Sequence, residues 1–317
     1  MFKNNLRKIL LGIVVVMIAV GSVGCKKKEE QAPKVEKKEE KKEEKKIGEL
    51  VNRKLDNLEF SINLLKNTYT FRQNSIVAPM SAQMALGVVL NGSSGTTQEA
   101  IIKTMGLETI KYNEYIKTYL DTLDNEDKDS LIYANSVWFN NVTGTLEVNS
   151  NFENRMKESL DADVQKLIFN QYTKENLNDW ISKNTNGFID SLFLHTSTTD
   201  VMYMVNAAAF NMDWLTTYGA SDIKNATFIN INKTLASVEM MTSEEKFYIE
   251  DNNATGFVKE YKNPRYKFVA LLPDATTNVY AYLKGMSANS LNKILSNISE
   301  EKVNVTIPKF TAGREKT

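Results

Sequence analysis

The single histidine of the chain, His195, is the first residue to consider for chemistry. A catalytic triad needs a base held beside a nucleophile and oriented by a third group. His195 lies in the polar segment LFLHTSTTD, and the chain contains no GxSxG sequence of a nucleophile elbow. We interpret His195 as a surface-loop residue. A hydrolase that uses His195 as its base is the weakest of the functions considered.

The sequence offers equally little evidence for a metal site or for a phosphate-binding site. With one histidine and one cysteine, a metal site would have to be built from carboxylates, and the densest acidic run is DNEDKD at residues 124–129. That run lacks the glycine and the terminal glutamate of a calcium loop, so we interpret it as a solvated helix end. Neither GxxxxGK[ST] nor GxGxxG occurs. We therefore expect no metal, no cofactor and no enzymatic activity.

Cys25 is the only cysteine, so an internal disulfide is impossible. It follows three basic residues, an apolar run of 12 residues at positions 9–20, and a group of small residues. The run is too short to span a bilayer comfortably. Residues 1–25 resemble a bacterial lipoprotein signal peptide with the lipobox SVGC, although Ser22 replaces the usual aliphatic residue. We expect a lipidated Cys25 that anchors the protein to the cell membrane, facing the extracellular side. An ordinary signal peptide is the alternative.

Residues 26–46 hold 10 lysines and 7 glutamates. This composition buries nothing, and the KKEE repeat places like charges such as Lys37 and Lys41 four residues apart, which opposes a helix. We predict a charged, disordered stalk. Beyond it, residues 47–317 carry 26 basic and 32 acidic side chains, a net charge of −6. Nucleic-acid binding needs a basic surplus, so we exclude nucleic acid as a partner.

Residues 47–317 are predicted to form an α+β domain. Helical periodicity dominates the first half of this segment, and strand patterns dominate its second half. Helices are expected at 47–65, 79–90, 112–123, 149–160, 173–183 and 281–298. Strands are expected at 75–78, 131–139, 164–169, 202–210 and 303–307, with about five more between 227 and 273. TTQE at 96–99 fits a capping box and Gly106 a helix C-terminus. The nearly continuous apolar strand 202–210 predicts burial on both faces.

Eight segments resemble motifs of the serpin family and occur in the family's order. They are NSIVAPMS (74–81), LNGSSGTT (90–97), ANSVWF (134–139), LNDWISKNTNGFI (177–189), VNAAAFNMDW (205–214), ASVEMM (236–241), FVALLPD (268–274) and VTIPKF (305–310). The resemblance implies three β-sheets surrounded by helices. It also implies suicide-substrate inhibition of serine or cysteine proteases, in which a cleaved loop inserts as a new strand.

The resemblance assigns roles to three residues. Ser81 and Asn206 match the shutter, the region beneath the central sheet where its strands part, and Trp214 matches the breach, where insertion begins. The alternative is that these three side chains simply pack the fold. Two departures from the family pattern stand beside them: Ala78 replaces a serine, and residues 211–213 replace a Lys-Gly pair.

In the family, the segment that VTIPKF resembles precedes a helix, a central strand, the hinge and the reactive-centre loop. We therefore expect residues 47–317 to form an incomplete serpin domain that lacks the reactive-centre bond and the C-terminal strands. The expected family role is inhibition of a target protease at the cell surface, defective in this truncated chain. The alternative is a non-inhibitory binding or structural surface lipoprotein on a serpin-like scaffold.

Overall fold

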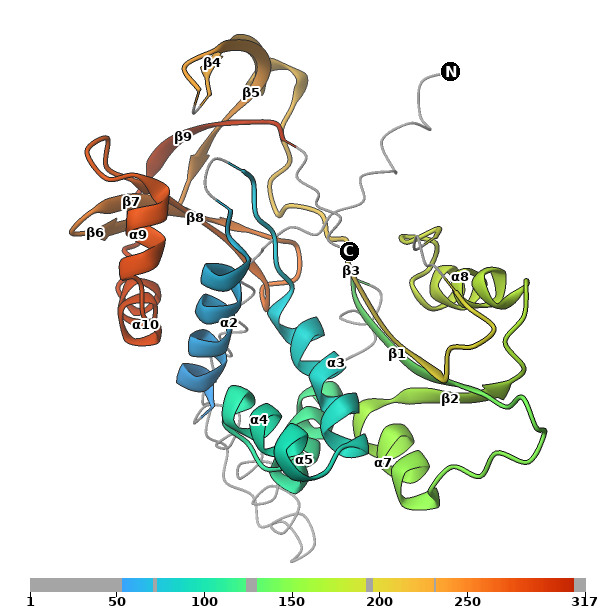
Figure 1. The fold of residues 1–317 in the computed structure, drawn as a ribbon. Helices are drawn as coiled ribbons and strands as arrows, with labels where there is room; N and C mark the ends of the chain where they lie inside the picture. The colour runs from blue at the N-terminus through green and yellow to red at the C-terminus, as the bar shows by residue number, and fades with distance from the viewer. Residues whose placement is uncertain (1–52, 71–72, 124–129, 192–195, 231, 311–317) are drawn as a thin grey trace, which may run out of the picture. The chain divides into compact units, whose positions relative to one another are not determined.

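The computed structural model describes residues 53–70, 73–123, 130–191, 196–230 and 232–310 (Figure 1). The predictions for the signal peptide, the stalk, Cys25, the acidic run 124–129 and His195 lie outside the described residues. Within the described ranges, no helix is long and apolar enough to cross a membrane, and no cluster of three His, Cys, Asp or Glu side chains could hold a metal. The described chain divides into two compact units, 53–56 with 78–211, and 57–77 with 212–310.

The first unit is built on a sheet whose strand order is β2-β1-β3 (Figure 1). The central strand β1 runs parallel to β2 and antiparallel to β3. The strands are β1 (Leu131–Asn140), β2 (Ala162–Leu167) and β3 (Met202–Phe210). The helices are α3 (Pro79–Gly92), α4 (Gly95–Met105), α5 (Thr109–Asp121), α7 (Ser150–Leu160) and α8 (Thr173–Asn184).

Helices cover both faces of this sheet. On one face, Leu177 and Ile181 of α8 pack in a buried cluster with Trp138 of β1 and Val205 of β3. Side chains alternate along a strand, so Asn206 projects from the opposite face, toward α3. The predicted burial of residues 202–210 on both faces is wrong at the start of the strand. Met202 and Met204 are 38% and 46% exposed, because the cover on the α3 face ends before them.

Local signals explain several of the helix ends. Pro79 occupies the first turn of α3, and Gly106 ends α4 in the left-handed conformation with φ of 69°, both as predicted. The capping box at 96–99 is wrong, because α4 already begins at Gly95 and has no side-chain cap. Asn149 caps α7 by accepting hydrogen bonds from the backbone N–H groups of the second and third residues of that helix. The expected strand at 75–78 does not form.

The second unit contains two more sheets, with strand orders β4-β5-β9 and β6-β7-β8. Their strands are β4 (Ile223–Ile229), β5 (Leu235–Glu245), β6 (Phe247–Asp251), β7 (Ala254–Glu260), β8 (Lys267–Pro273) and β9 (Val303–Pro308). The five strands expected between 227 and 273 are thus present. The helical elements are α2 (Lys54–Thr68, mostly in this unit), η1 (Ala220–Asp222), α9 (Val279–Gly285) and α10 (Ala288–Ser296).

Helix α10 connects the two parts of the core of this unit. Its Leu291 packs against Leu58 and Ile62 of α2, and its Ile294 packs against Ile249 and Val258 of β6 and β7. With the sheet of the first unit, the described residues contain three sheets and surrounding helices. The predicted α+β class and the number of sheets are therefore confirmed.

Candidate functional site

A relay of polar side chains connects helix α3 to the sheet of the first unit. The Ser81 hydroxyl, in the first turn of α3, donates to Oδ1 of Asn206 on β3. The Asn206 amide donates to Oδ1 of Asn135 on β1, at 2.7 Å, and the Asn135 amide donates to the Leu160 carbonyl at the end of α7, at 2.9 Å. The structure therefore brings Ser81 and Asn206 together. Each step also satisfies polar atoms that burial would otherwise leave without a partner.

Asn135 is the member of this relay that the sequence analysis missed. It is only 2% exposed and lies directly opposite Asn206 in the antiparallel register of β1 and β3. The sequence did contain a signal for this residue, because Asn135 is the asparagine of the motif-like segment ANSVWF. A polar residue inside a buried strand needs a hydrogen-bonding partner, and the cross-strand pairing supplies it.

Ala78 occupies the N-cap position of α3. The alanine side chain cannot accept a hydrogen bond, and α3 has no side-chain cap there. The sequence analysis noted that Ala78 replaces a serine. No other side chain takes over a capping role at this position. Within the described residues, the Ser81 hydroxyl forms a polar contact between the start of α3 and Asn206 of β3.

Trp214 belongs to the second unit, and we describe it separately from the relay. Its ring stacks on Tyr261 with centroids 4.4 Å apart and meets the edge of Phe268 at 5.6 Å. Burial raises the pKa of the Tyr261 phenol well above its ordinary value. Residues 211–213, before Trp214, depart from the family pattern. One of them, Asp213, forms an ion pair with Lys262 at 2.8 Å. Backbone bonds on both sides of Trp214 fix this segment to the end of β7.

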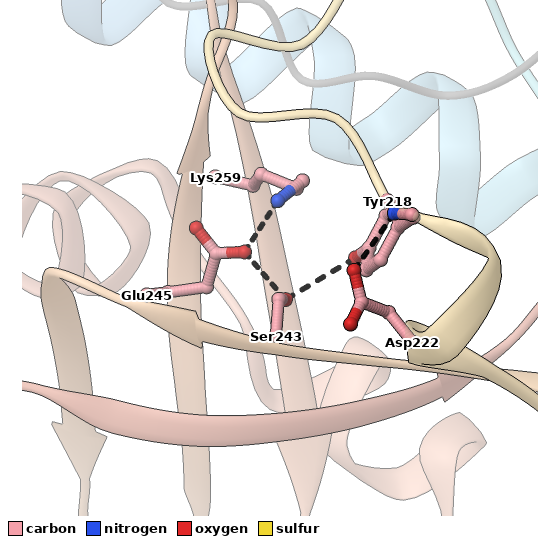
Figure 2. A network of polar contacts seen from close by, with 6 residues as sticks. Tyr218, Asp222, Ser243, Glu245 and Lys259 are labelled. Atoms are coloured by element: carbon pink, nitrogen blue, oxygen red, sulfur yellow. Dashed lines mark hydrogen bonds and ion pairs between the residues drawn. The ribbon is translucent and has the colours of Figure 1, made fainter.

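A second polar network lies beside Trp214 (Figure 2). Nζ of Lys259, on β7, donates to Oε1 of Glu245, on β5, at 2.5 Å, and the Ser243 hydroxyl donates to the same oxygen at 2.6 Å. The Lys259 ammonium also lies over the rings of Tyr218 and Trp214, 4.5 and 5.6 Å from their centroids. The side chains of Lys259 and Glu245 are 3% and 10% exposed, so this is a buried ion pair.

The sequence analysis did not predict this ion pair. Its partners are 14 residues apart on strands of two different sheets, and no motif places them together. In the sequence, Glu245 and Lys259 look like the solvated members of alternating strands. Only the packing of β5 against β7 shows that both are buried.

Comparison with known proteins assigns this architecture to a family. The family model for serpins, described as serine protease inhibitors, matches residues 55–316. The chain belongs to the serpin family. Among solved structures, the thermophilic serpin tengpin in its native state is 33% identical, with a TM-score of 0.74, over 82% of this chain and 67% of tengpin. Its latent state is 34% identical with a TM-score of 0.75, over 81% of this chain and 70% of tengpin.

Two further relatives show the same relationship at lower identity. A serpin-like protein of Thermococcus kodakarensis is 25% identical over 79% of this chain and 60% of its own length. The leukocyte elastase inhibitor of Xenopus laevis is 28% identical over 75% of this chain and 66% of its own length. This serpin chain thus spans about 60 to 70% of the length of these relatives. The predicted family and fold are confirmed, and the role that the family implies is inhibition of proteases.

Proposed function

We propose that the protein inhibits a serine protease as a suicide substrate. The observation that carries this proposal is the serpin family match over residues 55–316. In that mechanism the protease supplies the nucleophile and cleaves a loop of the inhibitor, which then adds to a sheet as a strand. The inhibitor contributes a sheet able to accept a strand, and it performs no catalysis itself.

The sheet of the first unit supports this proposal. Strand β1 is paired on both sides, whereas β3 has one paired edge within the described residues. We propose that an inserted strand pairs with the other edge of β3, and that Ser81 and Asn206 act as the shutter. Directional hydrogen bonds suit that role, because they hold α3 in one position against β3 and re-form after a small shift. We propose Trp214, stacked on Tyr261, as the breach.

A protease panel tests the inhibitory function. The protein is mixed with serine and cysteine proteases, and adducts are sought by SDS gel electrophoresis. We expect an SDS-stable adduct and a matching loss of protease activity with at least one serine protease. The same protease with its active-site serine chemically blocked is the control and is expected to form no adduct, because the acyl ester needs that nucleophile. Cleavage of the protein without any adduct would overturn the proposal.

We further propose that the protein is anchored outside the cell through a lipid on Cys25, with residues 26–46 as the stalk. The support is the lipobox-like segment before Cys25 and the charged composition after it. Metabolic labelling with a fatty-acid analogue tests the anchor. The unsubstituted protein should be labelled and fractionate with membranes, and Cys25→Ala should lose the label. Equal labelling of both proteins would contradict the proposal.

The alternative function is a non-inhibitory surface binding protein on the serpin scaffold. The polar pocket beside Lys259 is the observation that favours it. If the protein is neither cleaved by proteases nor forms adducts, yet unfolds cooperatively as a monomer, this second function is preferred. Aggregation or non-cooperative unfolding would count against it.

A further inference from the structure

The second unit contains a pocket of about 200 Å³ that is lined by polar and charged residues. Its walls are residues 216–218 of the segment after Trp214 and residues 242–244 of β5, with Asp222 and Lys259 completing the lining. Figure 2 shows Lys259 and Glu245 on one side of this region and Tyr218 and Asp222 on the other. Five of the eight lining residues carry hydroxyl groups.

Lys259 is the most buried residue of the pocket lining. Its side chain is 3% exposed, and among the described residues Glu245 is the one hydrogen-bond acceptor of its ammonium group. An ammonium group has three N–H donors, and the rings of Tyr218 and Trp214 lie at its sides. These rings attract the ammonium group more weakly than a further hydrogen bond to an oxygen atom would. Lys259 therefore favours a ligand that brings an oxygen atom into the pocket.

The charges around the pocket decide which kind of oxygen ligand fits. Lys259 is balanced by Glu245, and Glu244 is balanced by Lys302 at 2.7 Å. Asp222 accepts hydrogen bonds from the Gly219 N–H at 2.7 Å and from the Ser221 hydroxyl at 3.2 Å. The lining therefore has no surplus of positive charge to hold an anion. An apolar ligand would cover the exposed hydroxyl groups of Thr216 and Thr217 and give them no hydrogen bond in return.

We infer that this pocket binds a neutral polyhydroxylated ligand of the carbohydrate class. Sugar hydroxyl groups both donate and accept, so they match a wall that mixes hydroxyl groups, a carboxylate and an ammonium group. A sugar oxygen accepts from Lys259, and sugar hydroxyl groups donate to Asp222. Thr216 and Thr217 are exposed at the rim and exchange hydrogen bonds with the remaining hydroxyl groups. This binding is independent of protease inhibition.

Ligand-observed NMR on the full chain tests the inference. The neutral probes are D-glucose, D-galactose and N-acetyl-D-glucosamine, and the anionic probes are inorganic phosphate and D-glucuronate. We expect at least one neutral sugar to saturate with a Kd on the order of 1 mM, and neither anion to bind. Dextran, tested beside free glucose, distinguishes a polysaccharide chain from a soluble sugar as the source of the ligand.

Two variants locate the binding, with one matched control. Thr217→Val removes an exposed rim hydroxyl and should weaken binding about fivefold, the loss of one hydrogen bond. The double variant Lys259→Met/Glu245→Gln removes both buried charges and should abolish binding while circular dichroism stays unchanged. Thr227→Val, on the exposed surface of β4, should bind like the unsubstituted chain. The inference is overturned if no neutral sugar binds, if an anion binds instead, or if Thr217→Val and Thr227→Val bind equally well.

Discussion

The Ser81 hydroxyl on α3 donates a hydrogen bond to the Asn206 side chain on β3, across 125 positions of the sequence. Asn206 in turn donates to Asn135, so one side chain connects a helix to two neighbouring strands. The contact is local in space and directional, unlike the apolar packing around it. A change at Asn206 should therefore affect both contacts at once.

Asn206→Ala tests the energetic weight of this relay. The substitution leaves Asn135, which is 2% exposed, without a donor for its Oδ1 and leaves the Ser81 hydroxyl without its acceptor. We expect a loss of about 1–3 kcal/mol in the free energy of unfolding, measured by chemical denaturation. Met204→Ala is the matched control on the same face of β3. Met204 is 46% exposed, so its loss should stay within about 0.5 kcal/mol. Equal losses would show that the relay carries no special weight.

Gly87→Ala tests the close packing of α3 on α5. A Cβ atom at position 87 would lie 2.3 Å from the ring of Tyr112, which cannot move aside because it is 1% exposed and donates to the Gln83 carbonyl at 2.8 Å. We expect a loss of about 1–3 kcal/mol in the free energy of unfolding. Gly285→Ala, near the end of α9, is the control, since nothing lies within 4 Å of its Cβ position. That control should be neutral or stabilising by up to about 1 kcal/mol, and a similar loss in both variants would refute the packing argument.

The sequence was sufficient for several features whose signal was local or belonged to a family motif. Pro79 and Gly106 predict helix ends because their backbone preferences act within one turn. Ser81 and Asn206 were found through motifs, although periodicity alone does not pair them. The failures have physical reasons. Residues 75–78 have strand-forming side chains but no partner strand in the described sheets, and the Lys259–Glu245 pair depends on how two sheets pack.

The raised pKa of the Tyr282 phenol leads us to predict a loss of stability at high pH. Burial, together with the charge and the hydrogen bond of Asp251, raises the pKa of Tyr282 to about 12. In the unfolded chain the pKa of the phenol is about 10. Between these values the unfolded chain releases a proton that the folded chain keeps, so the stability contribution is complete below pH 10 and is lost as the pH rises toward 12. Denaturation midpoints measured over this window should therefore fall with pH.

Two variants isolate the contribution of Tyr282. Tyr282→Phe removes the titrating group, so the midpoint should fall less steeply between pH 10 and 12 than in the unsubstituted protein. Asp251→Asn removes the neighbouring charge, so the slope should lie between the other two. Burial also raises the pKa of Tyr112 and Tyr261, and part of the slope will therefore remain in both variants. An unchanged slope in Tyr282→Phe would contradict the assignment.

Because Lys259 and Glu245 form a buried ion pair, we predict that the effects of their substitutions on the free energy of unfolding are strongly non-additive. Lys259→Met leaves the Glu245 carboxylate buried without a cation, and Glu245→Gln leaves the ammonium without an anion, so each should cost about 3–5 kcal/mol of unfolding free energy. The double variant has no buried charge at this position and should lose much less than the sum of the two single losses. Lys117→Met is the control, because Lys117 and Asp121 form an exposed pair and its loss should cost at most about 1 kcal/mol. Additive losses in the double variant, measured by chemical denaturation, would show that the two charges do not depend on each other.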